Sequence, residues 1–528
     1  MSKHLFLLLS ILLSYSCKLY ASYDFEIDGV LYEIYYEDNT KVYVSGYHSN
    51  DQRRNLTIPS QVSRDEWGET KTYTVAGIYN YSFNDNWLET VILPETITYI
   101  GECAFSGCHN LCSVNIPSNL EILGRYAFAN TKIESVIIPD KLKEVSPGAF
   151  YQCADLKTVE LGKGVNSFVD AFSGCDNLID ITVDLANMNF SSYDGAVYTK
   201  RFDELVFCPM GKNSLIMTNL AEVIPEGLFR NHSKLKNVTL GESVKSIGDW
   251  AFSESGIVSI TLPDAVESIG VSAFFECRNL ASISIGSGLL TISGGYDVVH
   301  YLKMRYLLGV ENLEEITVSP EHPLYASFDG CLYDKSYSTL YLCPKKKNNP
   351  EIHSSTTLIE EDAFRDCVGI TDIKIPSSVM TINNRAFMGC ANMETLEIEP
   401  NEELTIWKYA FDVTHLRSIF CNCQQPPRCS DSFEGETNQD ECDFFDNAVL
   451  YVPRGTSDKY RQYYDWYRFK NMVEYDFAGI DDAAADNTGD FDVEGFYNAQ
   501  GVKSDKPWHG VNIVRYTNGR TAKKCIFK

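Results

Sequence analysis

Cysteines are the residues whose type and spacing most suggest chemistry in this sequence. Six of them close a recurring A-F-x-x-C unit, and a row of such thiols could hold a metal or carry redox chemistry. Two copies of the unit end instead in Thr131 and Ser255, which thiolate ligation of a metal would not tolerate. The regular spacing therefore favours one inward-facing repeat position filled by a small apolar residue. The six residues are Cys108, Cys153, Cys175, Cys277, Cys367 and Cys390.

A second group of cysteines follows the repeats. Its spacing, C-x-C-x5-C-x12-C, matches no standard pair of zinc-binding C-x-x-C units, so zinc is the less favoured interpretation. In an exported chain disulfides are favoured instead, and they would staple the end of the repeat array. The possible disulfides lie among Cys421, Cys423, Cys429 and Cys442. We therefore predict no metal site and no cofactor.

The sequence lacks the common catalytic motifs. It contains no G-x-S-x-G, H-E-x-x-H, G-x-x-x-x-G-K-S/T or G-x-G-x-x-G pattern, and its 9 histidines are scattered without a partner pattern. The acidic runs at residues 431–446 and 481–492 lack the D-x-D-x-D-G spacing of calcium loops. We predict a protein that is not an enzyme and has no catalytic residues. A triad that only the fold assembles would leave no local motif, so this prediction concerns motifs alone.

The composition excludes some partners. Of the 528 residues 44% are hydrophobic, which is typical of a folded protein. The chain carries 72 acidic against 45 basic residues, a net charge of −27. Because phosphate groups need a basic surface, nucleic acid and anionic membranes are poor partners.

The first residues predict export. Lys3 precedes an apolar run over residues 5–13, which is the pattern of a secretory signal peptide over residues 1–21. Cleavage after Ala21 is favoured, and the alternative is lipidation of Cys17 within a loose lipobox. No later stretch has about 18 consecutive apolar residues, so we expect no transmembrane segment. The protein is therefore expected to be secreted or to lie at the outer surface.

A repeat of 22 to 24 residues must position all these side chains. Its template is L-x-x-V-x-L-P-x-x-V-x-x-I-x-x-x-A-F-x-x-C, with clean copies at residues 88–108 and 370–390. The L-x-x-V-x-L part alternates with period two and predicts a short strand, which Pro then ends. Stacked repeats would bury one continuous core, so the fold class is mainly β with short turns and helices, a solenoid with a parallel sheet. The strand motif begins twelve times, at Leu88, Leu111, Ile133, Leu156, Leu178, Leu235, Ile257, Leu280, Leu313, Ile370, Met393 and Leu416.

Two islands interrupt the array, at residues 190–212 and 325–347. They align at a constant offset of 135 residues, and each predicts a β-hairpin inserted between a strand and its return turn. The aligned pairs are Asp194-Gly195 with Asp329-Gly330, Tyr198 with Tyr333, and Cys208-Pro209 with Cys343-Pro344. Residues 294–309 fit neither pattern, and we expect a short helix there.

The template resembles the BspA-type leucine-rich repeats of bacterial surface proteins. The A-F-x-x-C units, the Ile-Gly pairs before several of them, such as Ile100-Gly101, and the D-G-x-x-Y…C-P islands carry this resemblance. It extends to the segments at residues 23–29 and 450–455, so it covers about residues 23 to 475. The resemblance implies a leucine-rich repeat solenoid that attaches to host matrix proteins and other cells. It supplies no family-wide binding residue.

The last residues form a separate module. An Ala/Asp-rich linker leads to residues 491–528, which resemble the C-terminal β-module of type IX secretion cargo, although Asn512 stands where that module often has an aromatic residue. The predicted division is a signal peptide (1–21), an N-terminal β cap with a degenerate first repeat (22–83), the solenoid (84–430), a C-terminal cap (431–478), a linker (479–490) and the small β-module (491–528).

The exposed face of the sheet is the predicted binding face. Residues on either side of the central Val of the strand motif should point away from the core, and most are small or polar. Such a surface suits broad docking of a protein, although β-propensity alone also explains its Ser and Thr. The candidate residues are Thr90, Ser113, Asn115, Ser135, Thr158, Glu160, Asn237, Thr239, Ser259, Thr261, Ser282, Ser284, Asp372, Lys374, Thr395 and Glu397.

These observations favour a non-enzymatic surface or secreted protein that mediates adhesion or protein–protein interaction with host or neighbouring cells. The alternatives are a glycan-capture protein and a structural envelope protein. Phe420 is the one aromatic residue on the predicted face, which weakens the glycan interpretation because sugars stack on aromatic rings. We expect a monomer.

Overall fold

The computed structural model describes residues 23–47, 53–289, 312–412, 415–434, 438–477, 493–497, 503–504, 510–516 and 521–526. The predicted leader, the stretch at 294–309 and the linker at 479–490 lie outside the described residues. The chain divides into two compact units, Met1–Cys277 and Arg278–Lys528, which are described separately. No helix in the described part of the chain is long and apolar enough to cross a membrane.

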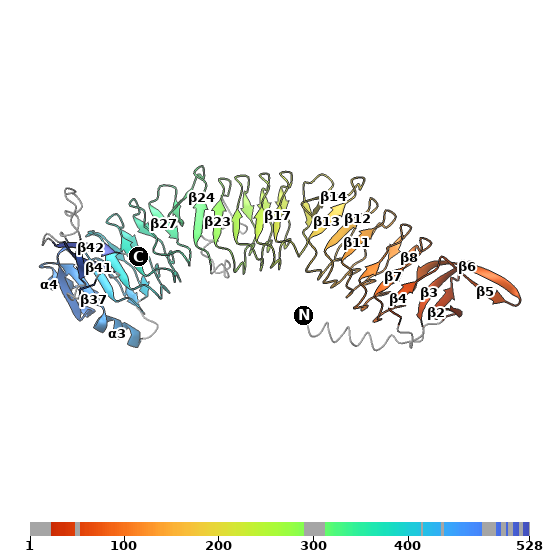
Figure 1. Cartoon of the computed structure of the whole chain (residues 1–528). Coiled ribbons are helices and arrows are strands. Elements are labelled where there is room, and N and C mark those ends of the chain that lie inside the picture. Colours follow the sequence, from red (N-terminus) through yellow and green to blue (C-terminus); the bar gives the residue numbers. More distant parts are fainter. Residues whose placement is uncertain are drawn as a thin grey trace. The chain divides into compact units, whose positions relative to one another are not determined.

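Unit 1 begins with an antiparallel cap (Figure 1). Strands β1 (Phe25–Ile27), β2 (Val30–Ile34) and β3 (Lys41–Tyr47) form a meander, and β5 (Gln61–Glu66) pairs with β6 (Glu69–Ile78) as a hairpin. The turn between β1 and β2 uses Asp28 and Gly29, both with positive φ, as two-residue hairpin turns require. β6 then pairs in parallel with β8 (Tyr99–Ile100), so the predicted N-terminal β cap is confirmed and continues directly into the coils.

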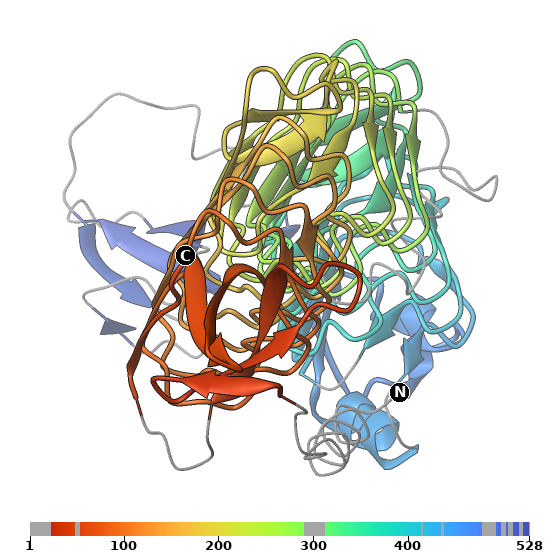
Figure 2. The same cartoon turned by 90° about the vertical axis from the view of Figure 1, so that its right-hand side faces the viewer.

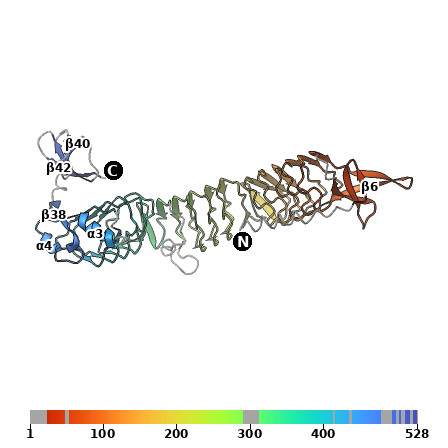
Figure 3. The same ribbon diagram turned by 90° about the horizontal axis from the view of Figure 1, so that it is seen from below.

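The coils of unit 1 carry a parallel strand on each of two sides (Figures 2 and 3). On one side the strand motifs form parallel ladders whose central residues are buried and whose flanking residues face outward, as predicted. On the other side two-residue strands follow the second apolar triplet of the template. The first side holds β4 (Asn55–Thr57), β7 (Thr90–Ile92), β9 (Ser113–Val114), β11 (Ser135–Ile138), β12 (Thr158–Leu161), β13 (Asp180–Val183), β17 (Ser214–Ile216), β19 (Asn237–Thr239) and β21 (Ser259–Thr261). The second holds β8, β10 (Ile122–Leu123), β18 (Val223–Ile224), β20 (Ser246–Ile247) and β22 (Ser268–Ile269).

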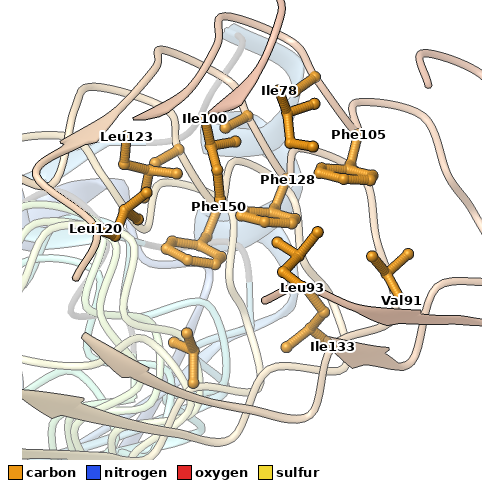
Figure 4. Close-up of a cluster of buried hydrophobic side chains, with 14 of the residues drawn as sticks. Ile78, Val91, Leu93, Ile100, Phe105, Leu120, Leu123, Phe128, Ile133 and Phe150 are labelled. Atoms are coloured by element: carbon orange, nitrogen blue, oxygen red, sulfur yellow. The ribbon is translucent and has the colours of Figure 1, made fainter. Parts of the chain in front are cut away.

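A column of stacked phenylalanines fills the core between the two sides (Figure 4). Phe105 and Phe128 are parallel with ring centroids 5.2 Å apart, and Phe128 stacks on Phe150 at 5.6 Å. All three rings are fully buried. Burial of each ring stabilises the fold by about 1.5–3 kcal/mol, and offset stacking adds to this. The repeated Phe is therefore the side chain that joins each coil to the next.

The A-F-x-x-C unit is a tight turn bounded by left-handed residues. The residue before Ala and the residue before Cys both have positive φ, as in Cys103 (51°) and Gly107 (73°) of the first clean repeat. Bulky residues such as Tyr126 and Trp250 adopt the first of these conformations in other coils, although non-glycine residues rarely do so. The turn thus reverses the chain within five residues and directs Ala, Phe and Cys inward.

The two islands are antiparallel sheets, which confirms the predicted hairpins and adds a third strand to each. The first contains β14 (Phe190–Tyr193), β15 (Ala196–Thr199) and β16 (Leu205–Phe207), and the second contains β25 (Tyr325–Phe328), β26 (Cys331–Asp334) and β27 (Thr339–Leu342). In unit 2, β27 also pairs in parallel with β28 (Leu358–Ile359), so this island extends a sheet of the solenoid.

Unit 2 repeats the coil architecture and closes it. The outward-facing strands are β23 (Ser282–Ile285), β24 (Glu315–Val318), β29 (Asp372–Ile375), β31 (Thr395–Ile398), β34 (Ser418–Cys421), β37 (Val449–Pro453) and β38 (Asn471–Tyr475). Opposite them lie β28, β30 (Thr381–Ile382), β32 (Thr405–Ile406) and β35 (Arg428–Cys429), with β33 (Phe411–Asp412) and β36 (Phe433–Glu434) pairing at a third position. Helices α3 (Asn438–Asn447) and α4 (Ser457–Tyr460) and the 3-10 turn η2 (Trp466–Arg468) follow.

The end of the solenoid core is capped by aromatic side chains. Trp466 is fully buried, packs edge-to-face on Phe433, and donates its indole N–H to the carbonyl of Pro427 at 2.8 Å. Trp466 and the rings around it cover the apolar end of the last coil, where no further repeat packs. Beyond it, β39 (Val493–Tyr497), β40 (Lys503–Ser504), β41 (Gly510–Tyr516) and β42 (Thr521–Ile526) form an antiparallel sheet, which confirms a small C-terminal β-module.

Candidate functional site

The repeated cysteines serve as hydrogen-bond donors within the core. Cys108 Sγ donates to the carbonyl of Phe83 at 3.0 Å, and Cys390 Sγ donates to the carbonyl of Phe364 at 3.0 Å, in each case one coil back. Burial raises the pKa of the Cys108 thiol to about 12, which disfavours the nucleophilic thiolate. Among the described residues, no cluster of three or more His, Cys, Asp or Glu could hold a metal ion. The repeated thiols are therefore buried side chains that donate hydrogen bonds from one coil to the coil before it.

The cysteines of the predicted staple lie at the closing cap. Cys421, Cys423 and Cys429 carry free thiols, and the Tyr460 hydroxyl contacts Cys421 Sγ at 3.2 Å while donating to the carbonyl of Cys423 at 2.8 Å. The side chain of Cys442 lies outside the described residues. Disulfides among these four residues stay a prediction.

The structure places the predicted binding face on the outward side of the parallel ladders. Its residues face one another in register, for example Ser135 with Thr158 and Lys374 with Glu397. Asn115 is already engaged, because its amide makes two hydrogen bonds of 2.7 Å with the backbone of Leu93 and so extends the ladder. Of the sixteen candidates, all but Asp372 are exposed or partly exposed.

Asp372 corrects the prediction, since only 7% of it is exposed. β29 is the first strand of its ladder, and the chain that leaves the second island runs along its edge. Asn349 Oδ1 accepts the backbone N–H groups of Thr371 (2.7 Å) and Asp372 (3.1 Å) from that segment. The segment that follows the second island therefore bonds to the backbone at the start of β29, where Asp372 is buried.

A groove of about 800 Å³ lies on the binding face in unit 1. It lies over the carboxyl ends of β11, β12 and β13 and the turns that follow them. Gly162 allows these turns to approach closely, because a Cβ there would lie 2.6 Å from the carbonyl oxygen of Ile138. The lining consists of Ile116, Ser118, Asn119, Ile137, Ile138, Pro139, Asp140, Lys141, Glu160, Leu161, Gly162, Lys163, Thr182, Val183, Asp184 and Leu185.

The groove combines exposed apolar side chains with charges of both signs. Leu185, on the turn after β13, is 95% exposed, and Ile137 on β11 is 64% exposed, so two large aliphatic side chains border the groove. Lys163 Nζ lies 2.9 Å from the Asp140 carboxylate, and this hydrogen bond lowers the pKa of Asp140 and raises that of Lys163. Glu160 is the one member of the predicted binding face that lines the groove. Such a surface can bind an extended segment but offers no deep pocket.

On the same kind of face in unit 2, Phe420 belongs to an aromatic patch whose other members, Tyr451 and Tyr475, were not predicted from the sequence. Phe420 on β34 lies in register with Tyr451 on β37, with ring centroids 4.4 Å apart and planes within 6°, and Tyr475 on β38 packs edge-on against both. β37 and β38 continue the ladder beyond the last counted repeat. The apolar alternation of Leu450 and Val452 was the available signal, but helix α3 separates these strands from the regular spacing.

Comparison with known proteins identifies the repeat. A family model described as the BspA type leucine rich repeat region matches residues 76–194, 201–317 and 337–447, in 6 copies. The chain belongs to this family. BspA-type repeat proteins are typically surface proteins that act in protein interaction or adhesion, and they are typically not enzymes.

Several solved structures resemble this BspA-type chain. A leucine-rich repeat protein from Bacteroides ovatus has 20% identity and a TM-score of 0.42, with 86% of this chain and 100% of that chain covered. The pneumococcal vaccine antigen PcpA has 14% identity and a TM-score of 0.38, with coverage of 86% and 98%. A leucine rich cell surface protein from Faecalibacterium prausnitzii has 18% identity and a TM-score of 0.24, with coverage of 79% and 96%. The comparison with curated proteins finds no match.

The groove of this BspA-type protein is lined by charged, polar and apolar groups. Its lining supplies three carboxylates (Asp140, Glu160 and Asp184) and two amines (Lys141 and Lys163), and it includes neither a histidine nor a cysteine. The similarity of the C-terminal module to secretion tails is not supported by the family match, which ends at residue 447.

Proposed function

We propose that this protein is a non-enzymatic surface or secreted adhesin that binds proteins of host or neighbouring cells through the outward face of its parallel ladders. The groove over β11, β12 and β13 is the proposed docking site for an extended segment of the partner. The observation that carries this proposal is the exposure of Ile137 and Leu185 beside that groove. Aliphatic side chains surrounded by polar groups are typical of the centre of a protein interface.

The charges of the groove give the proposed partner its chemistry. Lys141 and Lys163 lie on the turns after β11 and β12, and Glu160 lies on the strand between them. An apolar side chain of the partner would rest between Ile137 and Leu185, while polar groups on either side of it meet charges of both signs. Truncation of a buried contact of this kind typically costs 1–2 kcal/mol or more, which is about ten-fold in affinity.

Binding of the full mature chain to intact host cells and to immobilised matrix proteins tests the proposal. The double variant Ile137→Ser/Leu185→Ser should weaken binding at least ten-fold without changing the melting temperature. Ile92→Ser is the matched control, because Ile92 is 57% exposed on β7 of the same face but does not line the groove. Equal loss in the control, or none in the double variant, would remove the groove from the proposal.

Export is a further part of the proposal. Protease treatment of intact cells should release repeat peptides if the protein is displayed outward. The N-terminal residue of the mature protein separates the two processing routes, since ordinary cleavage leaves Ser22 and lipoprotein processing leaves a lipidated Cys17. Complete protection from the protease would contradict surface display.

Glycan capture is the second candidate function, and the aromatic patch of Phe420, Tyr451 and Tyr475 favours it. Tyr451 is half-buried, so part of its ring remains available to a sugar. A glycan array probed with the full chain tests this candidate, with Tyr451→Ala as the variant. Tyr463→Ala is the control, because Tyr463 is 44% exposed in the C-terminal cap away from the patch.

A further inference from the structure

The two islands differ at one cysteine. Ala196 in the first island corresponds to Cys331 in the second, at the offset of 135 residues that relates them. Both positions begin the central strand of their island, and both side chains are fully buried. The partner position is cysteine in both islands, Cys208 and Cys343. The second island therefore holds a pair of thiols where the first holds one.

A third cysteine nearby has a separate structural role. Cys367 ends the A-F-x-x-C unit of the coil after the second island, and its Sγ donates to the carbonyl of Cys343 at 3.4 Å. The same position after the first island is His232, whose Nε2 lies 3.0 Å from the carbonyl oxygen of Cys208. The two side chains thus bind equivalent carbonyl groups, those of Cys343 and Cys208. This hydrogen bond accounts for the presence of Cys367 without any reaction of its thiol.

Cys331 and Cys343 face each other across two antiparallel strands. Leu332 of β26 pairs with Leu342 of β27, so the next residues outward along the ladder are these two cysteines. Directly opposed residues of an antiparallel pair have Cα atoms about 4.5–5.5 Å apart, within the roughly 4.4–6.8 Å that a disulfide spans. Both cysteines are free thiols in this structure, so the bond requires their Sγ atoms to move together from hydrogen-bond contact. Both cysteines belong to the same buried core cluster. The pKa of the Cys343 thiol lies well above its usual range, because it is buried and hydrogen-bonded to the other two thiols.

We infer that Cys331 and Cys343 form a disulfide that locks the second island, and that the first island has no counterpart. The oxidant is a disulfide of the thiol-exchange class. One cysteine thiolate attacks it to form a mixed disulfide and releases one thiol. The second cysteine then attacks the mixed disulfide and releases the other thiol, so two thiols are oxidised while one external disulfide is reduced to two thiols.

The burial of the pair places this reaction during folding. Cys331 is 0% exposed and Cys343 is 1% exposed, so an external disulfide reaches neither in the finished coil. Once formed, the bond ties the start of β26 to the end of β27, and β27 continues into the solenoid through its pairing with β28. The island is then held covalently as well as by its ladder, and the bond is protected from reductants.

Refolding of the full chain tests the inference. The protein is unfolded in guanidinium with dithiothreitol, freed of reductant, and refolded with oxidised glutathione or, in parallel, with dithiothreitol retained. Free thiols are then blocked with N-ethylmaleimide under denaturing conditions, and the digest is analysed by mass spectrometry without reduction. We expect a peptide pair linked through Cys331 and Cys343 in the oxidised sample alone. Blocking of both residues in that sample, or a bond from Cys343 to any other cysteine, would overturn the inference.

A second measurement covers the consequence for stability. Wild-type protein refolded with oxidised glutathione should melt several degrees above protein refolded with dithiothreitol, because a cross-link restricts the unfolded chain. Cys331→Ala reproduces the natural Ala196 of the first island, so it is expected to fold, and its melting temperature should be the same after either treatment. A difference that persists in this variant would assign the stabilisation to other cysteines.

Discussion

Replacement of Cys108 tests the role assigned to the repeated cysteines. This side chain is fully buried, and its thiol donates to the carbonyl of Phe83 at 3.0 Å. Alanine removes the donor and leaves the buried carbonyl without it, which costs about 1–3 kcal/mol. The small void left by Sγ adds to this, so we expect Cys108→Ala to lower the free energy of unfolding by about 2–3 kcal/mol.

Serine at the same position separates hydrogen bonding from packing. Cys108→Ser keeps a donor, and we expect it to cost only about 1 kcal/mol, since a satisfied buried hydroxyl is close to neutral. The array already holds a hydroxyl at this position, because Thr131 occupies it. Thr131 donates within its own turn, to the carbonyl of Phe128 at 2.9 Å, and the same carbonyl also accepts from Cys153 Sγ at 3.1 Å. A thiol that acts only as a small apolar filler gives the opposite order, with alanine tolerated better than serine.

Urea unfolding and hydrogen exchange provide the assay. The midpoint and slope of the urea transition give the change in stability, while amide exchange shows where it acts. Each coil contacts only its neighbours, so faster exchange should be confined to the coils around residues 83–128. If alanine proves more stable than serine, or if exchange in unit 2 rises equally, the hydrogen-bonding account of the repeated cysteine is wrong.

Two further predictions follow from the core. Phe128→Ala should cost about 3–5 kcal/mol by urea unfolding, because the ring is fully buried and stacks on both neighbours, while Trp67→Ala, at a fully exposed side chain, should stay within about 0.5 kcal/mol. Burial raises the thiol pKa from 9.0 to about 12 for Cys108 and Cys208 and to about 11 for Cys277. Their contribution to stability is therefore full below pH 9 and is lost as pH rises toward 11–12, by about 1.4 kcal/mol per thiol and pH unit above 9. Urea midpoints from pH 8 to 10.5 should fall accordingly, and Cys277→Ser should make the fall less steep; a flat profile would contradict this account.

The repeat template predicts the strands because alternation with period two leaves one side of each coil apolar. The same pattern could not predict the turn of the A-F-x-x-C unit. Its first position is left-handed whether it holds Tyr126, Trp250 or Arg385, and none of these residues favours that conformation. Here the coil on either side imposes the backbone, and the local sequence does not.

The candidate site depends on insertions that a periodic pattern does not describe. Glu160 was predicted to face outward, but the groove around it requires Leu185 on the loop that leads into the first island. Asp372 was also predicted on the face from the repeat spacing, but it is buried at the start of β29, beside the segment that follows the second island. Tyr451 was missed because α3 lengthens the connection before β37. In each case a segment that interrupts the repeat lies next to the side chain, and the repeat spacing alone does not predict whether a partner could reach it.

These departures also indicate where specificity can arise in such an array. The inward positions are held by ring stacking and by the thiol-to-carbonyl hydrogen bonds. A substitution there, such as at Phe128, would therefore destabilise the fold and would not change the outward surface directly. The outward positions contact only their neighbours on the ladder, and most of them are small and polar, which gives every coil a similar surface. Under the proposed function, a partner would distinguish one stretch from another where that pattern changes, as it does at the groove bordered by Leu185 and at the rings around Tyr451. The islands and the closing helices interrupt the repeat, and the outward surface next to them therefore differs from one part of the array to another.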